Sequence, residues 1–328
     1  MTPGSIVVPD DFPPVLTGTP AEAQLRALDP SVRIFTERGA DDEPELIRRI
    51  GNAECVVNIR AHARFSERVI DACSNLRMIS VWGSGMDHVD LVACERRGIT
   101  VANTPGVNAH AVAEHTMALM LAVMRRIPQL DARVRAGEWP RGLSAQLEGK
   151  TLGIVGLGAV GSRVADLARA FGMTLLVTTA GADGGRAEAL GARHVPLDEL
   201  LRESDVITLH LRLNDETKGI IAREQFGLVK PTAYIVNTAR GALIDRDALL
   251  DALQHERIAG AALDVFNEEP LPAGDTLLSL PNVVLTPHNA GVTPEVNAEG
   301  LRRAVENVWR FLESNSSHAG LDRNVPHH

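Results

Sequence analysis

The sequence predicts an α/β protein built from two doubly wound domains, each a parallel sheet flanked by helices. Short runs rich in Val, Ile and Leu alternate with helix-like runs along most of the chain. One such run is followed by a glycine-rich turn that contains Gly156, Gly158 and Gly161. The 328 residues are enough for two domains with ordinary cores.

The first hundred residues predict a small parallel α/β unit. Strand-like and helix-like segments alternate there, and Ser66 before Glu67 is a suitable helix cap. The predicted strands are residues 5–8, 32–35, 55–59, 78–82 and 100–103, and the predicted helices are 22–28, 43–50, 66–72 and 87–97. This alternation is typical of a parallel sheet with helices packed on it.

A long apolar helix is predicted over residues 108–126. Its apolar residues cover most of its circumference, so we expect it to be buried between domains or between subunits. His110 and His115 lie on this helix, and we interpret them as core or interface residues rather than ligands. Residues 128–150 then predict a short helix and a loop.

The second half of the chain predicts a larger doubly wound sheet. Its strands are expected at residues 152–155, 174–178, 205–209, 233–237, 260–264 and 282–286. A final helix is expected over residues 293–311, and the tail beyond Ser314 is expected to be loose.

Composition and charge exclude several classes of function. The chain is 45% hydrophobic and 23% charged, as in soluble globular proteins, and its net charge of −9 argues against a broad nucleic-acid surface or attraction to anionic membranes. It has neither a signal-like N-terminus nor a membrane-length apolar run, so we expect a cytoplasmic protein. Cys55, Cys73 and Cys94 lack redox or metal-ligand spacing, so we expect buried thiols and assign no metal site.

The glycine-rich turn, in TLGIVGLGAVGSR, predicts a dinucleotide site. Its G-x-G-x-x-G spacing falls between a predicted strand and a predicted helix. Gly156 would allow the tight turn, Gly158 would let the backbone approach a pyrophosphate, and Gly161 would let the helix pack closely. The phosphates would then meet free N–H groups at the start of the helix.

Three predicted strands of the larger sheet are followed by the polar residues Arg240, Glu269 and His288. Ligands of open α/β sheets lie outside the carboxyl ends of the strands, so these residues could converge on one crevice. A His is suited to protonating a carbonyl oxygen, a bonded carboxylate orients that His, and an Arg can hold a substrate carboxylate. The combination favours hydride transfer to a carbonyl over three unrelated solvated loop residues.

Four segments resemble the signature segments of the D-isomer-specific 2-hydroxyacid dehydrogenase family, which includes phosphoglycerate dehydrogenases and glyoxylate or hydroxypyruvate reductases. They are TLGIVGLGAVGSRVADLARAFGM, VNTARGALIDRDALLDAL, GAALDVFNEEP and LTPHNAG, and the resemblance covers roughly residues 50–313. It implies a flavodoxin-like substrate-binding domain over 1–103 plus 294–328, and an inserted Rossmann NAD(P)-binding domain over 104–293. It also implies a homodimer built on the long helix and the segment 128–145.

The resemblance assigns roles to individual residues in the reversible reduction of a small 2-oxo acid to a D-2-hydroxy acid. His288 would be the acid/base, Glu269 its partner and Arg240 the substrate-orienting residue. The residues implied to contact NAD or NADP are Gly156, Gly158, Ala159, Val160, Gly161, Thr179, Leu211, Arg212, Thr238, Ala239, Asp264, Ala290 and Gly291. The residues implied to hold the substrate carboxylate through backbone N–H groups are Gly83, Ser84 and Gly85.

Three residues leave alternatives open. Thr179 stands where NAD-preferring members carry an acidic residue, which leaves the choice between NAD and NADP undecided. Arg212 replaces a usual Pro, and it is either a phosphate partner or a solvated loop residue. Arg60 either holds a second anionic group of the substrate or lies solvated at the surface.

Two rival functions use the same fold. One is an NAD(P)H-sensing, corepressor-like regulatory protein, which the complete Arg–Glu–His trio argues against. The other is a formate dehydrogenase, which lacks a Glu–His proton relay and is therefore disfavoured by Glu269.

Overall fold

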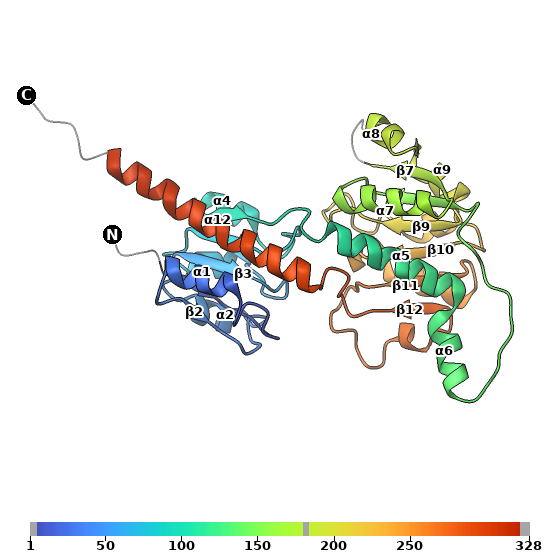
Figure 1. Ribbon diagram of the computed structural model, residues 1–328, viewed down its shortest axis with the longest axis horizontal. Helices are drawn as coiled ribbons and strands as arrows, with labels where there is room; N and C mark the ends of the chain where they lie inside the picture. The colour runs from blue at the N-terminus through green and yellow to red at the C-terminus, as the bar shows by residue number, and fades with distance from the viewer. Residues whose placement is uncertain (1–4, 180–183, 322–328) are drawn as a thin grey trace, which may run out of the picture. The chain divides into compact units, whose positions relative to one another are not determined.

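The computed structural model describes residues 5–179 and 184–321, and the chain forms two compact units. One unit is Ala109–Val292, and the other combines the chain up to Asn108 with the chain from Thr293 onward (Figure 1). Each unit is built on one sheet, and the strand pairs within both sheets are parallel. The predicted fold class, a parallel α/β fold with two sheets, is confirmed.

The outer unit, formed by the two terminal segments, has a five-stranded sheet in the order β2-β1-β3-β4-β5. Helices α1 and α12 pack on one face, and α2, α3 and α4 on the other. The strands are β1 (Ile6–Val8), β2 (Arg33–Ile34), β3 (Cys55–Asn58), β4 (Met78–Val81) and β5 (Thr100–Ala102). The helices are α1 (Pro20–Leu28), α2 (Glu43–Ile50), α3 (Glu67–Ala72), α4 (Leu91–Arg96) and α12 (Pro294–Leu321). Side chains cap the first four helices, including the predicted cap Ser66 on α3.

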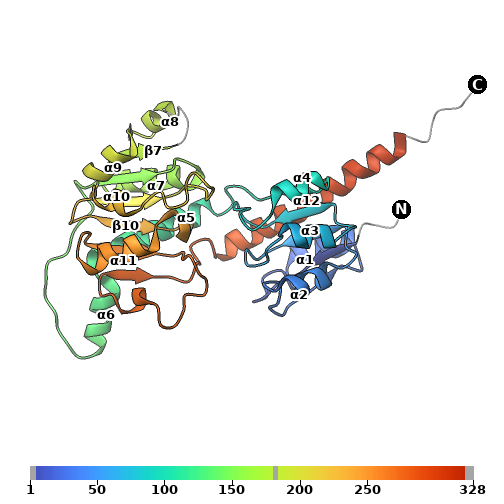
Figure 2. The ribbon, with the colours of Figure 1, turned by 180° about the vertical axis from the view of Figure 1, so that it is seen from behind.

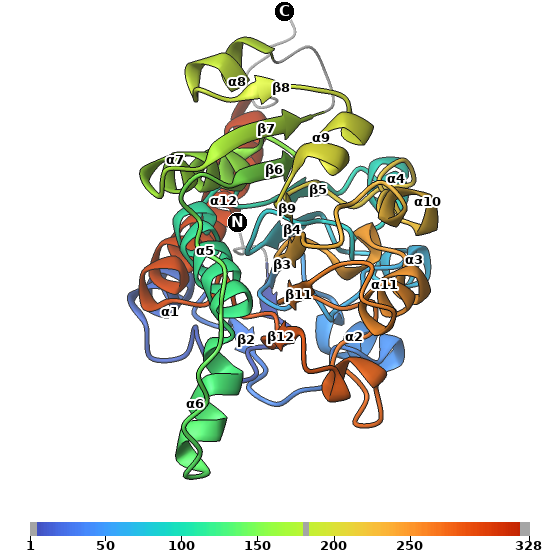
Figure 3. The same cartoon turned by 90° about the vertical axis from the view of Figure 1, so that its right-hand side faces the viewer.

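The inner unit, Ala109–Val292, has a seven-stranded sheet in the order β12-β11-β10-β9-β6-β7-β8. Helices α5 and α7 cover one face, and α9, α10 and α11 cover the other (Figures 2 and 3). The strands are β6 (Thr151–Val155), β7 (Thr174–Thr178), β8 (Arg193–His194), β9 (Val206–Leu209), β10 (Tyr234–Asn237), β11 (Gly260–Leu263) and β12 (Val283–Leu285). The α-helices are α5 (Ala109–Arg125), α6 (Ile127–Arg135), α7 (Ala159–Ala170), α8 (Gly184–Ala189), α9 (Leu197–Glu203), α10 (Arg223–Phe226) and α11 (Arg246–Gln254). Two short 3₁₀ helices are η1 (Gly241–Leu243) and η2 (Thr276–Ser279).

The structure departs from the sequence prediction at strand β8 and at the end of helix α12. The short edge strand β8 was missed because its two residues are both exposed and polar, so they carry no hydrophobic pattern. Helix α12 continues to Leu321, so the prediction of a loose tail directly beyond Ser314 was wrong. Extending an existing helix adds one hydrogen bond per ordered residue, so a polar segment can continue a helix that it could not start.

The long apolar helix α5 is buried within its own unit. Nine of its residues are buried, and it packs against α7 and against strands β10, β11 and β12. Its burial was predicted correctly, but a neighbouring domain or subunit is not needed to explain it. No helix among the described residues is long and apolar enough to cross a membrane.

The three cysteines are buried and unpaired, as expected. Burial is the largest effect on each thiol, and it raises the pKa of Cys55 to about 12 and the pKa values of Cys73 and Cys94 to about 11. At neutral pH these thiols are therefore protonated and act as small apolar side chains.

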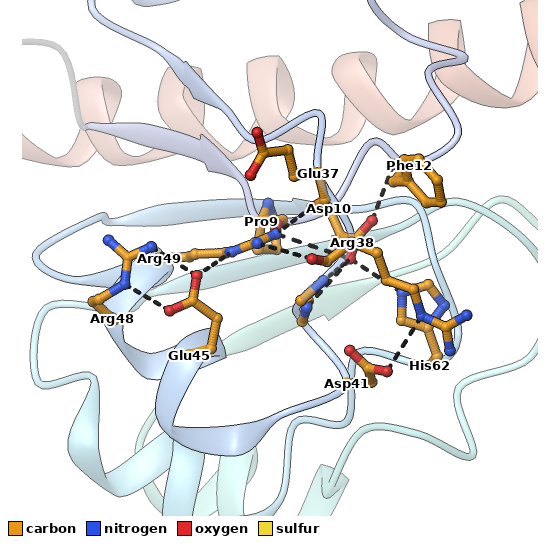
Figure 4. Close-up of polar contacts among 12 residues, drawn as sticks. Pro9, Asp10, Phe12, Glu37, Arg38, Asp41, Glu45, Arg48, Arg49 and His62 are labelled. Carbon is orange, nitrogen blue, oxygen red and sulfur yellow. Dashed lines mark hydrogen bonds and ion pairs between the residues drawn. The ribbon is translucent and has the colours of Figure 1, made fainter.

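A buried carboxylate organises the loops at the carboxyl end of β1 (Figure 4). Asp10 is 1% exposed and accepts hydrogen bonds from the backbone N–H groups of Phe12, Gly39 and Ala40 at 3.0–3.2 Å. It also bonds His62 Nε2 at 3.1 Å. Burial by itself would raise the pKa of Asp10, but the bonds from His62 and from the N–H groups outweigh it and lower the pKa to about 2.

We expect Asp10→Asn to lower the free energy of unfolding at pH 7 by about 2–4 kcal/mol, because an amide N–H₂ then faces backbone N–H donors. Because the pKa of Asp10 is lower in the folded protein than in the unfolded chain, the ionised carboxylate stabilises the fold at pH values above the unfolded pKa. This contribution is lost as the pH falls from about 4 towards 2. The variant should therefore lose less stability than the wild type between pH 7 and pH 3. Urea unfolding at both pH values, with the exposed Asp41→Asn as control, measures this. A loss below about 0.5 kcal/mol at pH 7 would contradict it.

Candidate active site

The glycine-rich turn lies between β6 and α7 and is shaped by two close backbone approaches. Gly156 has a φ of +103°, and a Cβ there would lie 2.8 Å from the carbonyl group of His210. A Cβ on Gly161 would lie 2.1 Å from the carbonyl oxygen of Gly156, so α7 packs directly on the turn. A Cβ on Gly158 would meet no protein atom within 4 Å. Gly158 thus leaves space at the start of α7, where backbone N–H groups favour an anion.

This turn lies at the point where the strand order of the inner sheet reverses. Strand β6 pairs with β7 on one side and with β9 on the other, and ligands of doubly wound sheets bind at such a switch point. Leu211 and Arg212 follow β9 on one side of it, and Thr179 follows β7 on the other. The residues predicted to contact a dinucleotide therefore share one edge of the sheet.

Hydrogen bonds order the turn after β10 and determine whether the Thr238 hydroxyl donates or accepts. The side chain of Asn237 accepts a bond from the N–H of Ala239 at 3.0 Å and donates one to the carbonyl of Arg240 at 2.9 Å. The hydroxyl of Thr116, on α5, lies 2.9 Å from the hydroxyl of Thr238 and donates its proton to a carbonyl of its own helix. Thr238 must therefore donate to Thr116, which leaves the Thr238 oxygen able to accept a further hydrogen bond.

Glu269 and His288 form a hydrogen-bonded pair. His288 Nδ1 lies 2.7 Å from Glu269 Oε2, and the other oxygen of Glu269 accepts the N–H of Phe266 at 2.9 Å. Burial raises the pKa of Glu269, but the bond and charge of His288, the N–H of Phe266 and the charge of Arg240 together lower it. Glu269 is therefore ionised at neutral pH and is bonded directly to the imidazole of His288.

Arg240 is brought towards this pair by a close contact between loops. A Cβ on Gly241 would lie 2.2 Å from the backbone carbonyl carbon of Phe266, so the turn after β10 packs on the loop that carries Glu269. Arg240 Nη1 donates to the carbonyl of Ala239 at 2.8 Å, and the Arg240 charge lowers the pKa of Glu269. The inner unit therefore assembles Arg240, Glu269 and His288 at the carboxyl ends of β10, β11 and β12.

Asp264 performs a structural task that the sequence did not reveal. It directly follows β11, has no exposed surface, and accepts the N–H groups of Asn289 and Ala290 at 3.0 and 2.9 Å. The hydroxyl of Thr286 also donates to it, at 2.6 Å. Asp264 thus holds the loop around His288, while its predicted contact with a nicotinamide carboxamide remains a prediction.

His115, Thr116 and Thr286 were missed as site residues. Helical periodicity placed His115 and Thr116 on an apolar helix, and the sequence does not show that this part of α5 meets the carboxyl ends of β10, β11 and β12. His115 Nε2 lies 3.1 Å from the hydroxyl of Thr286, which explains its half-buried position without an interface.

The predicted carboxylate loop, Gly83–Gly85, follows β4 in the outer unit. Gly83 has a φ of +120°, and its N–H donates to the hydroxyl of Thr104 at 2.7 Å. That N–H is engaged within the protein, and the contact of this loop with a substrate carboxylate stays a prediction. The side chain of Ser84 accepts the N–H of Gly106 at 3.2 Å, which orders the loop further.

Arg60 follows β3, the neighbour of β4, and is half-buried rather than freely solvated. Its Nη2 donates to the carbonyl of Pro13, and its buried Nε has no hydrogen-bond partner among the residues that the structure describes. Burial lowers the pKa of Arg60, and the nearby carboxylates of Asp10 and Asp11 partly offset this shift. Arg60 thus lies near two carboxylates of its own unit.

Comparison with known proteins gives a consistent result. Residues 117–290 match the family described as "D-isomer specific 2-hydroxyacid dehydrogenase, NAD binding domain". A glyoxylate reductase of Aeropyrum pernix is 42% identical over 75% of this chain and 76% of its own length. A D-3-phosphoglycerate dehydrogenase of Archaeoglobus fulgidus is 43% identical over 76% of this chain, which corresponds to 48% of its own length.

The fold likeness extends over almost the whole chain. A crystal structure of D-lactate dehydrogenase from Aquifex aeolicus, complexed with NAD and lactic acid, is 31% identical with a TM-score of 0.83. The match covers 95% of this chain and 97% of that one.

Proposed function

Because this chain belongs to the D-isomer-specific 2-hydroxyacid dehydrogenase family and is therefore a nicotinamide-dependent oxidoreductase, we propose that it reduces a small 2-oxo acid, with His288 as acid/base. The observation that carries this proposal is the Glu269–His288 pair, with its 2.7 Å bond beside Arg240. The sensor alternative has no corresponding need for a proton relay.

The cofactor would be held by backbone and side-chain groups at the switch point. The open space at Gly158 and the start of α7 fit the pyrophosphate, and the acceptor oxygen of Thr238 suits an amide N–H of the nicotinamide carboxamide. When bound, the nicotinamide supplies or accepts the hydride.

The protein side chains would handle the proton and the carboxylate. Because Nδ1 of His288 is bonded to Glu269, Nε2 is the nitrogen that would give the proton to the carbonyl oxygen. Arg240 would hold the substrate carboxylate with its planar guanidinium. Glu269 would keep His288 oriented for the transfer.

We expect His288→Ala to lower kcat by about 10²–10⁴-fold while NAD(P)H affinity stays within about threefold. Glu269→Gln should also lower kcat, because His288 loses the carboxylate that orients it. Because the pKa of Glu269 is lowered, the acid fall of wild-type activity caused by its protonation should lie below the usual titration range of a glutamate. Steady-state pH profiles and cofactor fluorescence titrations measure both effects. Undiminished turnover by His288→Ala would exclude the proposed acid/base.

The substrate would carry one carboxylate and no second anionic group. Arg60 already donates to the carbonyl of Pro13, and the nearby charges of Asp10 and Asp11 would weaken its attraction for a phosphate. We therefore expect glyoxylate or hydroxypyruvate to be reduced at least about tenfold more efficiently than 3-phosphohydroxypyruvate. Parallel assays of these three with pyruvate and phenylpyruvate measure kcat/KM. A preference for the phosphorylated acid would contradict this substrate class, and tight cofactor binding without any turnover would favour a sensor.

Thr179 decides the choice of cofactor in this proposal. It directly follows β7, where a carboxylate would repel a 2′-phosphate, so we expect the protein to accept NADPH as well as NADH. Thr179→Asp should lower kcat/KM for NADPH by about 10–100-fold through like-charge repulsion, with little change for NADH. Assays with both cofactors test this, and Thr179→Ser, which keeps the neutral hydroxyl, is the matched control. An unchanged NADPH/NADH ratio in Thr179→Asp would exclude the role of this position.

We propose that the chain forms a homodimer through α6. Ile127, Leu130 and Val134 lie on one side of this helix by their spacing and are 52%, 38% and 49% exposed, respectively. Light scattering after size exclusion should give a mass near twice 35.2 kDa, and the double substitution Ile127→Glu with Val134→Glu should give the single-chain mass. The charge-neutral control is Gln129→Ala. A wild-type mass of one chain would contradict the dimer.

A further inference from the structure

The side chain of His115, on α5, reaches the loop that carries His288 through two other side chains. His115 Nε2 lies 3.1 Å from Thr286 Oγ1 and 3.6 Å from Asp264 Oδ1. Asp264 in turn accepts the N–H groups of Asn289 and Ala290, which directly follow His288. A continuous path of polar contacts therefore runs from α5 to the backbone beside the proposed acid/base.

The donors along this path have a fixed direction. A threonine hydroxyl has a single proton, and Thr286 gives its proton to Asp264 at 2.6 Å. The oxygen of Thr286 must therefore accept a hydrogen bond from His115, so His115 carries its proton on Nε2. His115 thus donates to Thr286, whose hydroxyl donates to the buried carboxylate of Asp264, and its task does not depend on a change of charge.

The loop that carries His288 adopts a backbone conformation that requires support. His288 has a φ of +52°, a left-handed conformation that costs a residue with a Cβ about 1 kcal/mol or more. Asp264 is fully buried, and burial raises its pKa, but bonds from His115, Thr286, Ala290 and Asn289 outweigh this and lower it. Removing one of these donors would weaken the acceptor that fixes the loop.

We propose that His115 is a positioning residue of the reaction: through Thr286 and Asp264 it fixes the loop that directs His288 towards the substrate carbonyl. The proposal rests on the proposed role of His288. A misplacement of about 1 Å at a reacting group can cost about 100-fold in rate, so a residue that acts only through others can have a large effect on kcat. His115 itself need not touch substrate or cofactor.

The test compares His115→Leu, which removes the donor, with His115→Gln, whose side-chain amide can place an N–H near the position of Nε2. We expect His115→Leu to lower kcat by about 10–50-fold with less than a threefold change in NAD(P)H affinity, and His115→Gln to recover kcat to within about threefold of wild type. Thr286→Val and Thr286→Ser form a second matched pair, which serves if His115→Leu does not fold. The combination of His115→Leu with Thr286→Val should cost no more than the worse single change, since both act on the same carboxylate.

Two results would overturn the proposal. One is a kcat of His115→Leu within threefold of wild type. The other is an equal loss of kcat in the Leu and Gln variants although their melting temperatures differ, which would indicate a packing role. His288→Ala is measured in the same series. If that variant keeps full turnover, the proposed function fails, whereas an inactive His288→Ala beside an active His115→Leu refutes only the positioning role.

Discussion

The buried carboxylate of Asp264 is the interaction on which the candidate active site depends. It lies at the end of β11 and accepts three hydrogen bonds, two of them from backbone N–H groups of the loop after β12. Without an acceptor there, these N–H groups would lose their hydrogen-bond partner, and the loop with the left-handed turn at His288 would lose part of its support. The fixed position of the carboxylate therefore determines where the imidazole can lie.

The outer unit also contains a buried carboxylate that accepts backbone N–H groups from its loops. Asp10 follows β1 as Asp264 follows β11, and each carboxylate has almost no exposed surface and accepts backbone N–H groups from loops distant in sequence. The loops at the carboxyl end of a parallel sheet come from separate crossovers and are not joined by the hydrogen bonds of the sheet. One central acceptor can therefore order several of them at once. In both units, hydrogen bonds to the charged form overcome the effect of burial on the pKa.

The two carboxylates of the inner site have different tasks because their surroundings differ. Asp264 is surrounded by backbone and hydroxyl donors that keep it charged and immobile. Glu269 is partly exposed, and one of its oxygens accepts the backbone N–H of Phe266 while the other bonds His288. Glu269, unlike Asp264, is therefore bonded directly to the imidazole of His288. Helix α5 supports both the turn at Thr238 and the carboxylate of Asp264, which makes this apolar helix part of the site.

The sequence by itself determined the features that local patterns encode. Alternating apolar runs predicted both parallel sheets, the spacing of Gly156, Gly158 and Gly161 predicted the turn at the switch point, and three polar strand ends indicated Arg240, Glu269 and His288. The sheets and the turn were predicted correctly because the period of a strand and the steric needs of a turn depend only on nearby residues, whereas the roles of the three polar residues stay predictions.

The tertiary structure decided what depends on contacts between distant segments. It turned the Gly83 N–H towards Thr104, paired Arg60 with Pro13, and brought His115 and Thr116 of α5 to the ends of the strands. Hydropathy describes the face of a helix but not which residues of another element meet it, so His115 looked like a core residue. The direction of a hydrogen bond follows only once both partners are placed in space, and for this reason the support of the His288 loop was visible in the structure alone.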